Sequence, residues 1–313
     1  MRWPLICSLL LAASACRSGG PEQPPLSLAV LRPDGAAILF SAANGKTCFL
    51  YEADIASGAT HRLTRATTGC ESDPAFSEDG LRIAFMFAQE RGARAALILA
   101  NADGTSQRTL VSSIEDNFQP VFVPHSKRIL FLRSGAFEHY SPLAANHRHK
   151  IDLFSADLAT GAVVQITQQK FYECSHVTVS ADGKKIIMSV ETYPEGSHFL
   201  ILPAVEAGNT TQSLQPAVRN APSPPQIYNA SLLPDGGSMI FSAAAQTTGD
   251  FDYNVYRLDI ASGATEQLTT GSGLLDGLSV STDGTKAVLL RQGVYSVLDL
   301  GTRQLTTVPI RFQ

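Results

Sequence analysis

The chain has 313 residues and a formal net charge of −4 at pH 7, with 44% hydrophobic and 17% charged residues. Its basic residues form no run or stripe, which argues against a nucleic-acid-binding protein. The apolar share is ample for a folded core, and the length suits a closed β architecture.

The first 15 residues have the parts of a secretion signal. Arg2 provides the positive start, Pro4–Ala13 is an apolar run, and the small residues at 13–15 suit a signal peptidase. The apolar run is too short for a permanent transmembrane helix, which takes roughly 20 residues. We therefore expect residues 1–15 to be removed on export.

The residues around the expected cleavage point carry a further pattern. Leu11-Ala12-Ala13-Ser14-Ala15-Cys16 resembles the lipobox of bacterial lipoproteins. The resemblance implies that Cys16 is lipid-modified and that residues 16–26 form a short tether. Because Arg17 rather than Asp follows, it also implies an outer-membrane lipoprotein that faces the periplasm. Plain secretion with a free Cys16 is the alternative.

A short phrase then recurs six times, at intervals of 45 to 57 residues. Its usual form is a small or apolar residue, a polar residue, Asp-Gly and an apolar run. The copies are centred on Asp34-Gly35, Asp79-Gly80, Pro124-His125 (where the Asp-Gly is lost), Asp182-Gly183, Asp235-Gly236 and Asp283-Gly284. Six copies at this spacing are typical of propeller blades.

Strand signals surround each copy of the phrase. An apolar run such as Ile38-Leu39-Phe40 follows the Asp-Gly turn, and a third strand, a Ser-Gly turn and a fourth strand come after it. Glycine suits these tight hairpin turns because it adopts positive φ without a Cβ clash. The heptapeptide 54–60 recurs unchanged at 259–265. We therefore predict an all-β fold over residues 27–313, a closed six-bladed propeller of four-stranded antiparallel blades rather than a solenoid.

The blade phrase also carries a family resemblance. Residues 73–85, Asp-Pro-Ala-Phe-Ser-Glu-Asp-Gly-Leu-Arg-Ile-Ala-Phe, are similar to the PD40 (WD40-like) repeat of the TolB-type propellers. The endings Gly58–Thr64 and Gly263–Thr269 fit that repeat too. The resemblance implies a role in envelope integrity or as a scaffold. The family's additional N-terminal α/β domain has no counterpart in this pattern.

Length variation should gather on one face of the ring. In this topology the Asp-Gly and Ser-Gly turns share one face, and the second-to-third-strand loops and blade connections share the other. The second-to-third loop is short at Gln292-Gly293 but long in blade three, from about Ser134 to Lys150, and the connection 215–229 is also long. Insertions on one face of a repeat array usually mark its binding face.

The blade-three loop supplies most of the candidate binding residues. It gathers aromatic, cationic and imidazole side chains, and two more candidates follow it. The set is Phe137, His139, Tyr140, His147, Arg148, His149, Tyr172 and His176. We expect a partner or ligand surface here. A zinc-type site through three of these histidines, His147, His149 and His176, and a plain solvated loop are the alternatives.

Two other patterns concern calcium binding and disulfide formation. A calcium loop over 249–254 is disfavoured, because Val255 replaces the required glycine. Export makes a disulfide possible among Cys48, Cys70 and Cys174. Cys48 and Cys70 should share one face of blade one, whereas Cys70 and Cys174 occupy equivalent sites two blades apart. The sequence does not decide this pairing.

Signatures of common enzyme classes are missing from the sequence. It has no Gly-x-Ser-x-Gly elbow, no glycine-rich phosphate loop and no His-Glu-x-x-His. The remaining enzyme hypothesis is a metal-assisted, carbohydrate-active propeller that resembles oligogalacturonate lyase, or a glycosidase. Its candidate carboxylates are Glu71, Asp73, Asp116 and Glu173. We favour a non-catalytic, monomeric binding module without a cofactor, whose partner is an envelope protein or a cell-wall component.

Overall fold

The computed structural model describes residues 26–139, 146–192, 196–203, 212–223, 226–246 and 251–312. Within these ranges the regular structure is entirely β, as the sequence predicts. The described part of the chain contains no helix with the length and apolarity needed to span a bilayer.

Six groups of four consecutive strands form the blades. Blade one is β1 (Val30–Leu31), β2 (Ala37–Asn44), β3 (Thr47–Asp54) and β4 (Ala59–Arg62). Blade two is β5 (Cys70–Phe76), β6 (Arg82–Ala88), β7 (Ala96–Asn101) and β8 (Arg108–Val111). Blade three is β9 (Asp116–Phe122), β10 (Arg128–His139), β11 (Asn146–Asp157) and β12 (Val163–Gln165).

The second half of the ring has the same pattern. Blade four is β13 (Glu173–Val179), β14 (Lys185–Thr192), β15 (Gly196–Pro203) and β16 (Gln212–Leu214). Blade five is β17 (Ile227–Leu232), β18 (Ser238–Gln246), β19 (Phe251–Asp259) and β20 (Thr265–Gln267). Blade six is β21 (Leu275–Val280), β22 (Lys286–Arg291), β23 (Val294–Asp299) and β24 (Leu305–Thr307).

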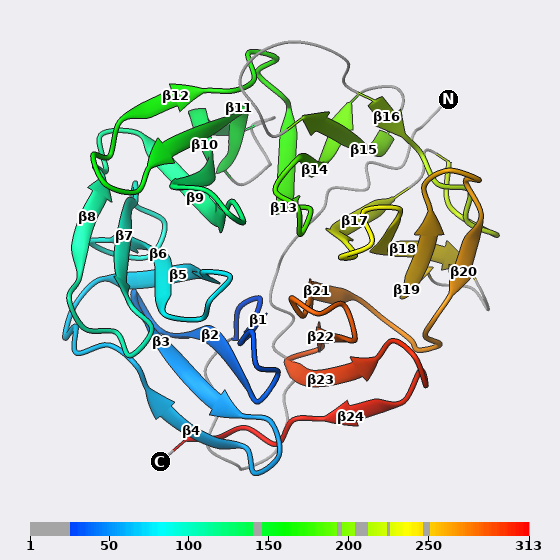
Figure 1. Ribbon diagram of the computed structural model, residues 1–313, viewed down its shortest axis with the longest axis horizontal. Coiled ribbons are helices and arrows are strands. Elements are labelled where there is room, and N and C mark those ends of the chain that lie inside the picture. Colours follow the sequence, from blue (N-terminus) through cyan, green and yellow to red (C-terminus); the bar gives the residue numbers. More distant parts are fainter. Residues whose placement is uncertain are drawn as a thin grey trace.

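The blades stand around a common centre with their first strands innermost (Figure 1). Neighbouring strands within each blade are antiparallel, and blades three to six are separate four-stranded sheets. The sheets of blades one and two are joined into one by a short parallel pairing of β3 with β5, at Cys48 and Cys70. The six-bladed propeller predicted from the repeat is confirmed.

The recurring phrase builds the turn between the first and second strands. In three blades a serine hydroxyl donates to the aspartate two residues later at 2.6 Å, as in Ser77 to Asp79. The glycine N–H then donates back to the serine carbonyl, and Gly80 adopts a φ of +67°. These turns lie on what we call the turn face. The second-to-third-strand turns and the blade connections lie on the opposite, variable face.

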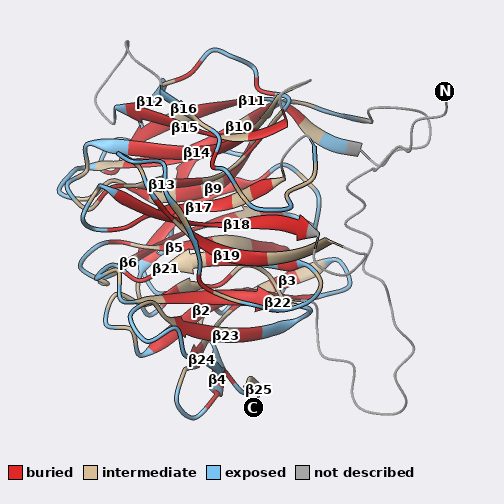
Figure 2. Cartoon of the chain, turned by 90° about the vertical axis from the view of Figure 1, so that its right-hand side faces the viewer, coloured by how far each residue is buried: buried red, intermediate tan, exposed pale blue. Residues whose placement is uncertain are grey.

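Apolar packing between neighbouring blades forms the core. Met86 and Leu97 of blade two share one buried cluster with Phe131 of blade three, and Phe40 of blade one shares another with Tyr295 of blade six. In Figure 2 the middle of the strands is buried, and exposed residues gather at the two faces. The ring is therefore continuous in its hydrophobic packing.

The last strand secures the closure between blades six and one. β25 (Arg311–Phe312) pairs in parallel with β4, the outermost strand of blade one, and the Arg311 N–H donates to the Gly58 carbonyl at 2.9 Å. Phe312 reaches the ring of Tyr51 with 5.1 Å between centroids. The C-terminal segment thus becomes a fifth strand of the first blade.

The prediction that blade three has a long loop over 134–150 is wrong. β10 and β11 are 12 residues each, and they pair from Arg128 with Asp157 out to His139 with Asn146. The extra residues prolong a hairpin beyond the length of the other blades. The pairing keeps one register on both sides of Gly135 and Lys150, where Lys150 adopts a φ of 54°.

Candidate functional site

The innermost strands carry a repeated β-bulge that shapes the channel. In four successive blades the bulge holds a non-glycine residue in the left-handed region, with φ of 49° at Asp73, 49° at Gln119, 53° at His176 and 59° at Asn229. This conformation is uncommon outside glycine. We refer to Asp73, Gln119, His176 and Asn229 as the bulge ring.

Hydrogen bonds connect the bulge ring from blade to blade. The Gln119 N–H donates to Oδ2 of Asp73 at 3.2 Å, and the His176 N–H donates to Oε1 of Gln119 at 2.7 Å. The Asn229 side chain instead donates to Oγ of Ser242 in its own blade, at 2.8 Å. Gln119 and His176 therefore each present a backbone N–H to the side chain of the preceding blade.

The channel contains a cavity of about 490 Å³ that runs from the bulge ring to the turn face. Most of its wall is apolar, with prolines such as Pro33 and Pro234 at the outer end. The polar side chains at its inner end are Asp73, Gln119, His176 and Asp276. An apolar wall with a few convergent polar groups is a common form of ligand site.

Burial governs the charges at this inner end. It lowers the pKa of His176 to about 4, so the imidazole is neutral near pH 7. Burial raises the pKa of Asp73, while the nearby charge of Arg148 opposes that shift. Among the described residues no lysine or arginine lines the cavity. The inner end is therefore rich in hydrogen-bond acceptors.

On the variable face, blade three contributes an ion pair. Nε of Arg148 lies 2.8 Å from Oδ2 of Asp116, and a second guanidinium nitrogen lies 3.1 Å from Oδ1. The guanidinium also sits 4.3 Å from the ring centre of Phe118. Arg148, a predicted binding residue, is thus held by a bidentate contact and an aromatic ring.

Blade four contributes two facing carboxylates. Glu173 on β13 is the direct cross-strand partner of Glu191 on β14. Burial raises the pKa of both side chains, and the charge of Glu173 raises the pKa of Glu191 further. A like-charged pair placed directly opposite in a sheet is destabilising.

Blade five adds two tyrosines beside these carboxylates. The rings of Tyr228 and Tyr253 lie 6.3 Å apart, and the Tyr253 hydroxyl donates to Oε1 of Gln226. Burial, followed by the charge of Glu191, raises the pKa of both phenols. We call Asp116, Arg148, Glu173, Glu191, Tyr228 and Tyr253 the polar arc, since it crosses three consecutive blades.

His149 and Tyr172 connect blade three to the carboxylates. Their rings lie 4.8 Å apart, and Nδ1 of His149 lies 3.2 Å from the Tyr172 carbonyl oxygen. The charge of His149 acts on Glu173 and lowers its pKa against the effect of burial. Among the described residues, the buried Nε2 atom of His149 has no hydrogen-bond partner.

The other predicted binding residues are divided between surface and channel. Phe137 is 55% exposed on the β10–β11 hairpin, and His147 is exposed on the same hairpin. His176 lies in the channel rather than on the variable face. Tyr140 and the side chain of His139 lie outside the described residues.

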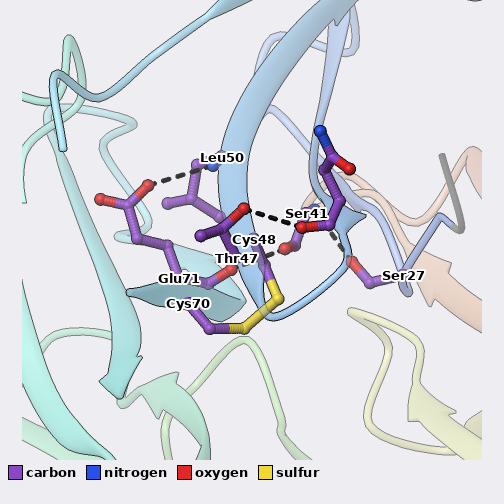
Figure 3. The surroundings of a disulfide bond; sticks show 8 residues. Ser27, Ser41, Thr47, Cys48, Leu50, Cys70 and Glu71 are labelled. Atoms are coloured by element: carbon purple, nitrogen blue, oxygen red, sulfur yellow. Dashed lines mark hydrogen bonds between the residues drawn. A yellow bond between two sulfur atoms is a disulfide. The ribbon is translucent and has the colours of Figure 1, made fainter. Parts of the chain in front are cut away.

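Of the disulfides that the sequence left open, Cys48–Cys70 is present (Figure 3). It joins the two residues at which β3 and β5 pair, and the Cys48 N–H also donates to the Gly69 carbonyl at 3.1 Å. The neighbouring Glu71 is buried, and its Oε2 accepts hydrogen bonds from the Leu50 N–H and the Thr64 hydroxyl. This disulfide ties blade one to blade two.

Two sequence expectations about these positions are wrong. Cys174 is buried and has a free thiol, so it makes no link with Cys70. The bulges align Cys174 with Glu71 and place Glu173 where blade two has Cys70. Nor do the four proposed carboxylates converge, because the buried Glu71 carboxylate accepts its hydrogen bonds from the Leu50 N–H and the Thr64 hydroxyl.

The metal alternatives find no support in the described residues. Within them, no three His, Cys, Asp or Glu side chains are placed to hold a metal ion. His147 is exposed, His149 is buried in blade three, and His176 belongs to the bulge ring. Part of the disfavoured calcium loop, residues 249 and 250, lies outside the described residues.

Sequence reasoning missed several residues of the site. Glu191, Tyr228, Tyr253, Gln119 and Asp276 were not among the candidates. Each becomes part of the site through a neighbouring strand or blade, so no local pattern marks it. Aligning the blades on the residue before Pro74 and Pro120 would have revealed the bulge positions in blades two and three.

Comparisons with known proteins bear on the fold. No protein-family model matches the sequence, and no curated protein sequence matches it. Among solved structures, TolB from Acinetobacter baumannii superposes with a TM-score of 0.62 at 18% identity, over 91% of this chain and 63% of that one. The chain thus spans less than two thirds of that protein.

Two further solved structures are similar. The putative TolB from Agrobacterium tumefaciens has a TM-score of 0.62 at 16% identity and is covered over 91% of both chains. An oligogalacturonate lyase in complex with manganese has a TM-score of 0.59 at 15% identity, over 89% of this chain and 75% of that one. These likenesses agree with the repeat, the six blades and the closed ring: the chain has the fold of the TolB-like six-bladed β-propellers.

Proposed function

We propose that this protein is a non-catalytic binding or scaffold lipoprotein of the bacterial cell envelope. It is anchored by lipid at Cys16 to the periplasmic side of the outer membrane, and its variable face binds an envelope protein or a cell-wall component. The TolB-like fold and the lipobox resemblance support the envelope location.

One observation supports the variable face as the binding face. The β10–β11 hairpin departs most from the blade repeat, and the side chain of Phe137 on it is 55% exposed. Ile114, just before the first strand of the same blade, is 72% exposed. Large apolar side chains exposed on a projecting element often mark a protein interface. The polar arc begins on this hairpin, at Arg148, and offers groups for specific recognition.

The test is in-cell crosslinking followed by pull-down of the full chain. In the test variant residues 138–147 are replaced by Asn-Gly, which keeps the pair of Phe137 with Arg148. A point variant, Phe137→Ser, is compared with Leu81→Ser, since Leu81 is 68% exposed at the Asp-Gly turn, on the opposite face. We expect the hairpin variants to lose the partner and Leu81→Ser to retain it. Equal capture by all forms would contradict the assignment of the face.

The anchor has its own test. Cys16→Ser should move the protein from the membrane fraction to the soluble fraction without changing its thermal midpoint. Retention of the variant in the membrane fraction would contradict lipidation at this residue.

A carbohydrate-active enzyme is the second candidate. The likeness to the oligogalacturonate lyase structure and the facing carboxylates of blade four favour it. It predicts release of unsaturated uronates from acidic oligosaccharides, with or without added manganese, and loss of that release in Glu173→Gln. An active wild-type protein would replace the binding proposal as its primary function.

A further inference from the structure

The N-terminal segment joins the ring from the variable face. β2 begins at the turn face and ends at the variable face, and the segment leading into β1 runs antiparallel to it. Leu26 forms a bridge with Ala42, close to the variable-face end of β2. The Tyr295 hydroxyl of blade six donates to the Ser27 carbonyl. The chain therefore enters at the variable face, at the seam between blades six and one.

The expected lipid anchor is close to this point in the sequence. Cys16 precedes Leu26 by ten residues, and a fully extended chain of that length reaches at most about 36 Å. The eight residues of β2 span about 26 Å, and a four-stranded blade is about 14 Å wide. A path from Leu26 round the rim to the turn face is therefore longer than this tether. An anchor at Cys16 would keep the turn face away from the membrane.

Two exposed apolar side chains lie beside the entry point, on the variable face of blade six. Leu274, in the connection from blade five, is 54% exposed, and Val294, directly before Tyr295, is 48% exposed. Arg291 links them. It pairs with Val294 across the β22–β23 hairpin, and its guanidinium donates to two carbonyls of the connection that carries Leu274, at 2.9 and 3.1 Å. We call Leu274 and Val294 the blade-six edge.

The turn face is less suited to contact with lipid. Most of its turns place an aspartate there, and hydrogen bonds from Ser77 and Ser281 lower the pKa of Asp79 and Asp283. Both carboxylates are therefore ionised near pH 7, and ionised groups resist removal from water. Among the described residues, the exposed large hydrophobic side chain of this face is Leu81.

The rim offers no single apolar side either. Its exposed large hydrophobic side chains, within the described ranges, lie on outer strands on opposite sides of the ring (Figure 1). They are Val163 and Val164 on β12, Leu305 on β24 and Phe312 on β25. A side-on orientation would leave one of these groups in solvent, whereas the blade-six edge is beside the tether.

We infer that the variable face is turned toward the bilayer and that Leu274 and Val294 contact the lipid surface next to the tether. This inference rests on the proposed function, because it needs the anchor at Cys16. It adds that the partner is met close to the membrane. A short tether holds the edge near the surface at an effective concentration of roughly millimolar, so two apolar side chains suffice for a populated contact.

Tryptophan fluorescence tests this orientation. The single tryptophan of the chain is Trp3, in the segment expected to be removed on export, so an introduced tryptophan is the sole emitter. Val294→Trp reports the blade-six edge, Leu81→Trp the turn face and Leu305→Trp the rim of blade six, and all three positions are exposed. Each variant is expressed as the full chain, purified with its lipid and reconstituted into phospholipid vesicles. Brominated acyl chains in the vesicles quench a tryptophan that reaches the lipid.

We expect Val294→Trp to lose most of its emission in brominated vesicles, and Leu81→Trp and Leu305→Trp to lose little. Adding Leu274→Ser to Val294→Trp should restore much of the emission, whereas the matched change Leu81→Ser should not. Thermal midpoints confirm that each variant is folded. Stronger quenching at Leu81→Trp or Leu305→Trp than at Val294→Trp would overturn the inference. Equal emission of all three in brominated and ordinary vesicles would overturn it too.

Sedimentation of the same vesicles separates this inference from the proposed function. A protein that sediments with the vesicles but is not quenched at Val294→Trp refutes the docked face and leaves the anchor standing. A protein without lipid that stays in the supernatant refutes the anchor and the inference together. Quenching at Val294→Trp without any partner captured in the crosslinking experiment refutes the binding module and leaves the docked face standing.

Discussion

Blade two satisfies the polar groups at its entrance through contacts with blade one, whereas blade four places two carboxylates directly opposite each other. The entrance of blade two holds a disulfide at Cys70 and a buried, hydrogen-bonded Glu71. The entrance of blade four holds Glu173 and the free thiol of Cys174 at the aligned positions. One repeated scaffold therefore uses the same two positions for stabilising contacts in blade two and leaves them as a facing carboxylate and a free thiol in blade four.

The largest expected difference concerns the disulfide. A bridge between residues 22 positions apart stabilises by about 3 kcal/mol, mainly by restricting the unfolded chain. Replacing both Cys48 and Cys70 with alanine should lower the free energy of unfolding by that amount, and Cys174→Ala should cost less. Urea unfolding measures both. A reducing agent should reproduce the effect in the wild type and add nothing in the double variant.

The two glutamates come next. Glu71→Ala leaves the Leu50 N–H and the Thr64 hydroxyl without their acceptor and should cost about 2 kcal/mol. Glu173→Ala breaks no hydrogen bond of the described structure and relieves a like-charge contact, so its unfolding free energy should stay within about 0.5 kcal/mol of wild type. Equal destabilisation by both changes would erase the contrast between the blades.

The repeated heptapeptide offers a matched pair of glycines. Gly58 and Gly263 have φ of 71° and 70°, so alanine at either position costs about 1 kcal/mol or more. A Cβ at Gly58 would also meet the Pro309 carbonyl oxygen of the closing segment, whereas a Cβ at Gly263 meets nothing within 4 Å. We expect Gly58→Ala to lower the free energy of unfolding by about 1 kcal/mol more than Gly263→Ala does, as measured in urea. The difference stays this small because the short strand β25 can detach and relieve the clash.

The smallest effect is a pH dependence in blade four. Burial and the charge of Glu173 raise the pKa of Glu191 above its ordinary 4.5 in the folded protein. The folded state thus binds this proton more tightly, and stability falls as the pH rises from 4.5 through the raised pKa. Glu191→Gln lacks this loss and should be more stable at pH 7, by up to about 1 kcal/mol. The gain should vanish near pH 4 in thermal unfolding, and a gain that persists there would exclude charge as its cause.

The fold was predictable because its signals are local. Each Asp-Gly turn, such as Ser77–Gly80, and each apolar run, such as Ile83–Phe85, is specified within a few residues, and the repeat supplies the number of blades. The hairpin of blade three was predicted as a loop because His147, Arg148 and His149 have no strand alternation of apolar and polar residues. Pairing with β10 holds these three residues in a strand, although their own sequence does not favour one.

The site was predictable only in part. Arg148 and His149 were identified from the density of cationic and imidazole side chains in one segment, and the structure does place them beside the carboxylates. Glu191, Tyr228 and Tyr253 reach Glu173 through a cross-strand pair and a neighbouring blade. Such contacts depend on the exact register of two strands, and a shift of one residue would turn each side chain to the other face.

The position of β25 also bears on how the chain folds. Hairpins within a blade join residues close in sequence, whereas Arg311 pairs with Ala59 at the far end of the chain. Closing so long a loop carries a large entropic cost, which favours early formation of blades and late joining of the ring. The seam between blades six and one should then be the first place to open in the native protein. Amide hydrogens of β4 and β24 would exchange before those of β10 and β14, and a slow final folding phase would report the meeting of the chain ends.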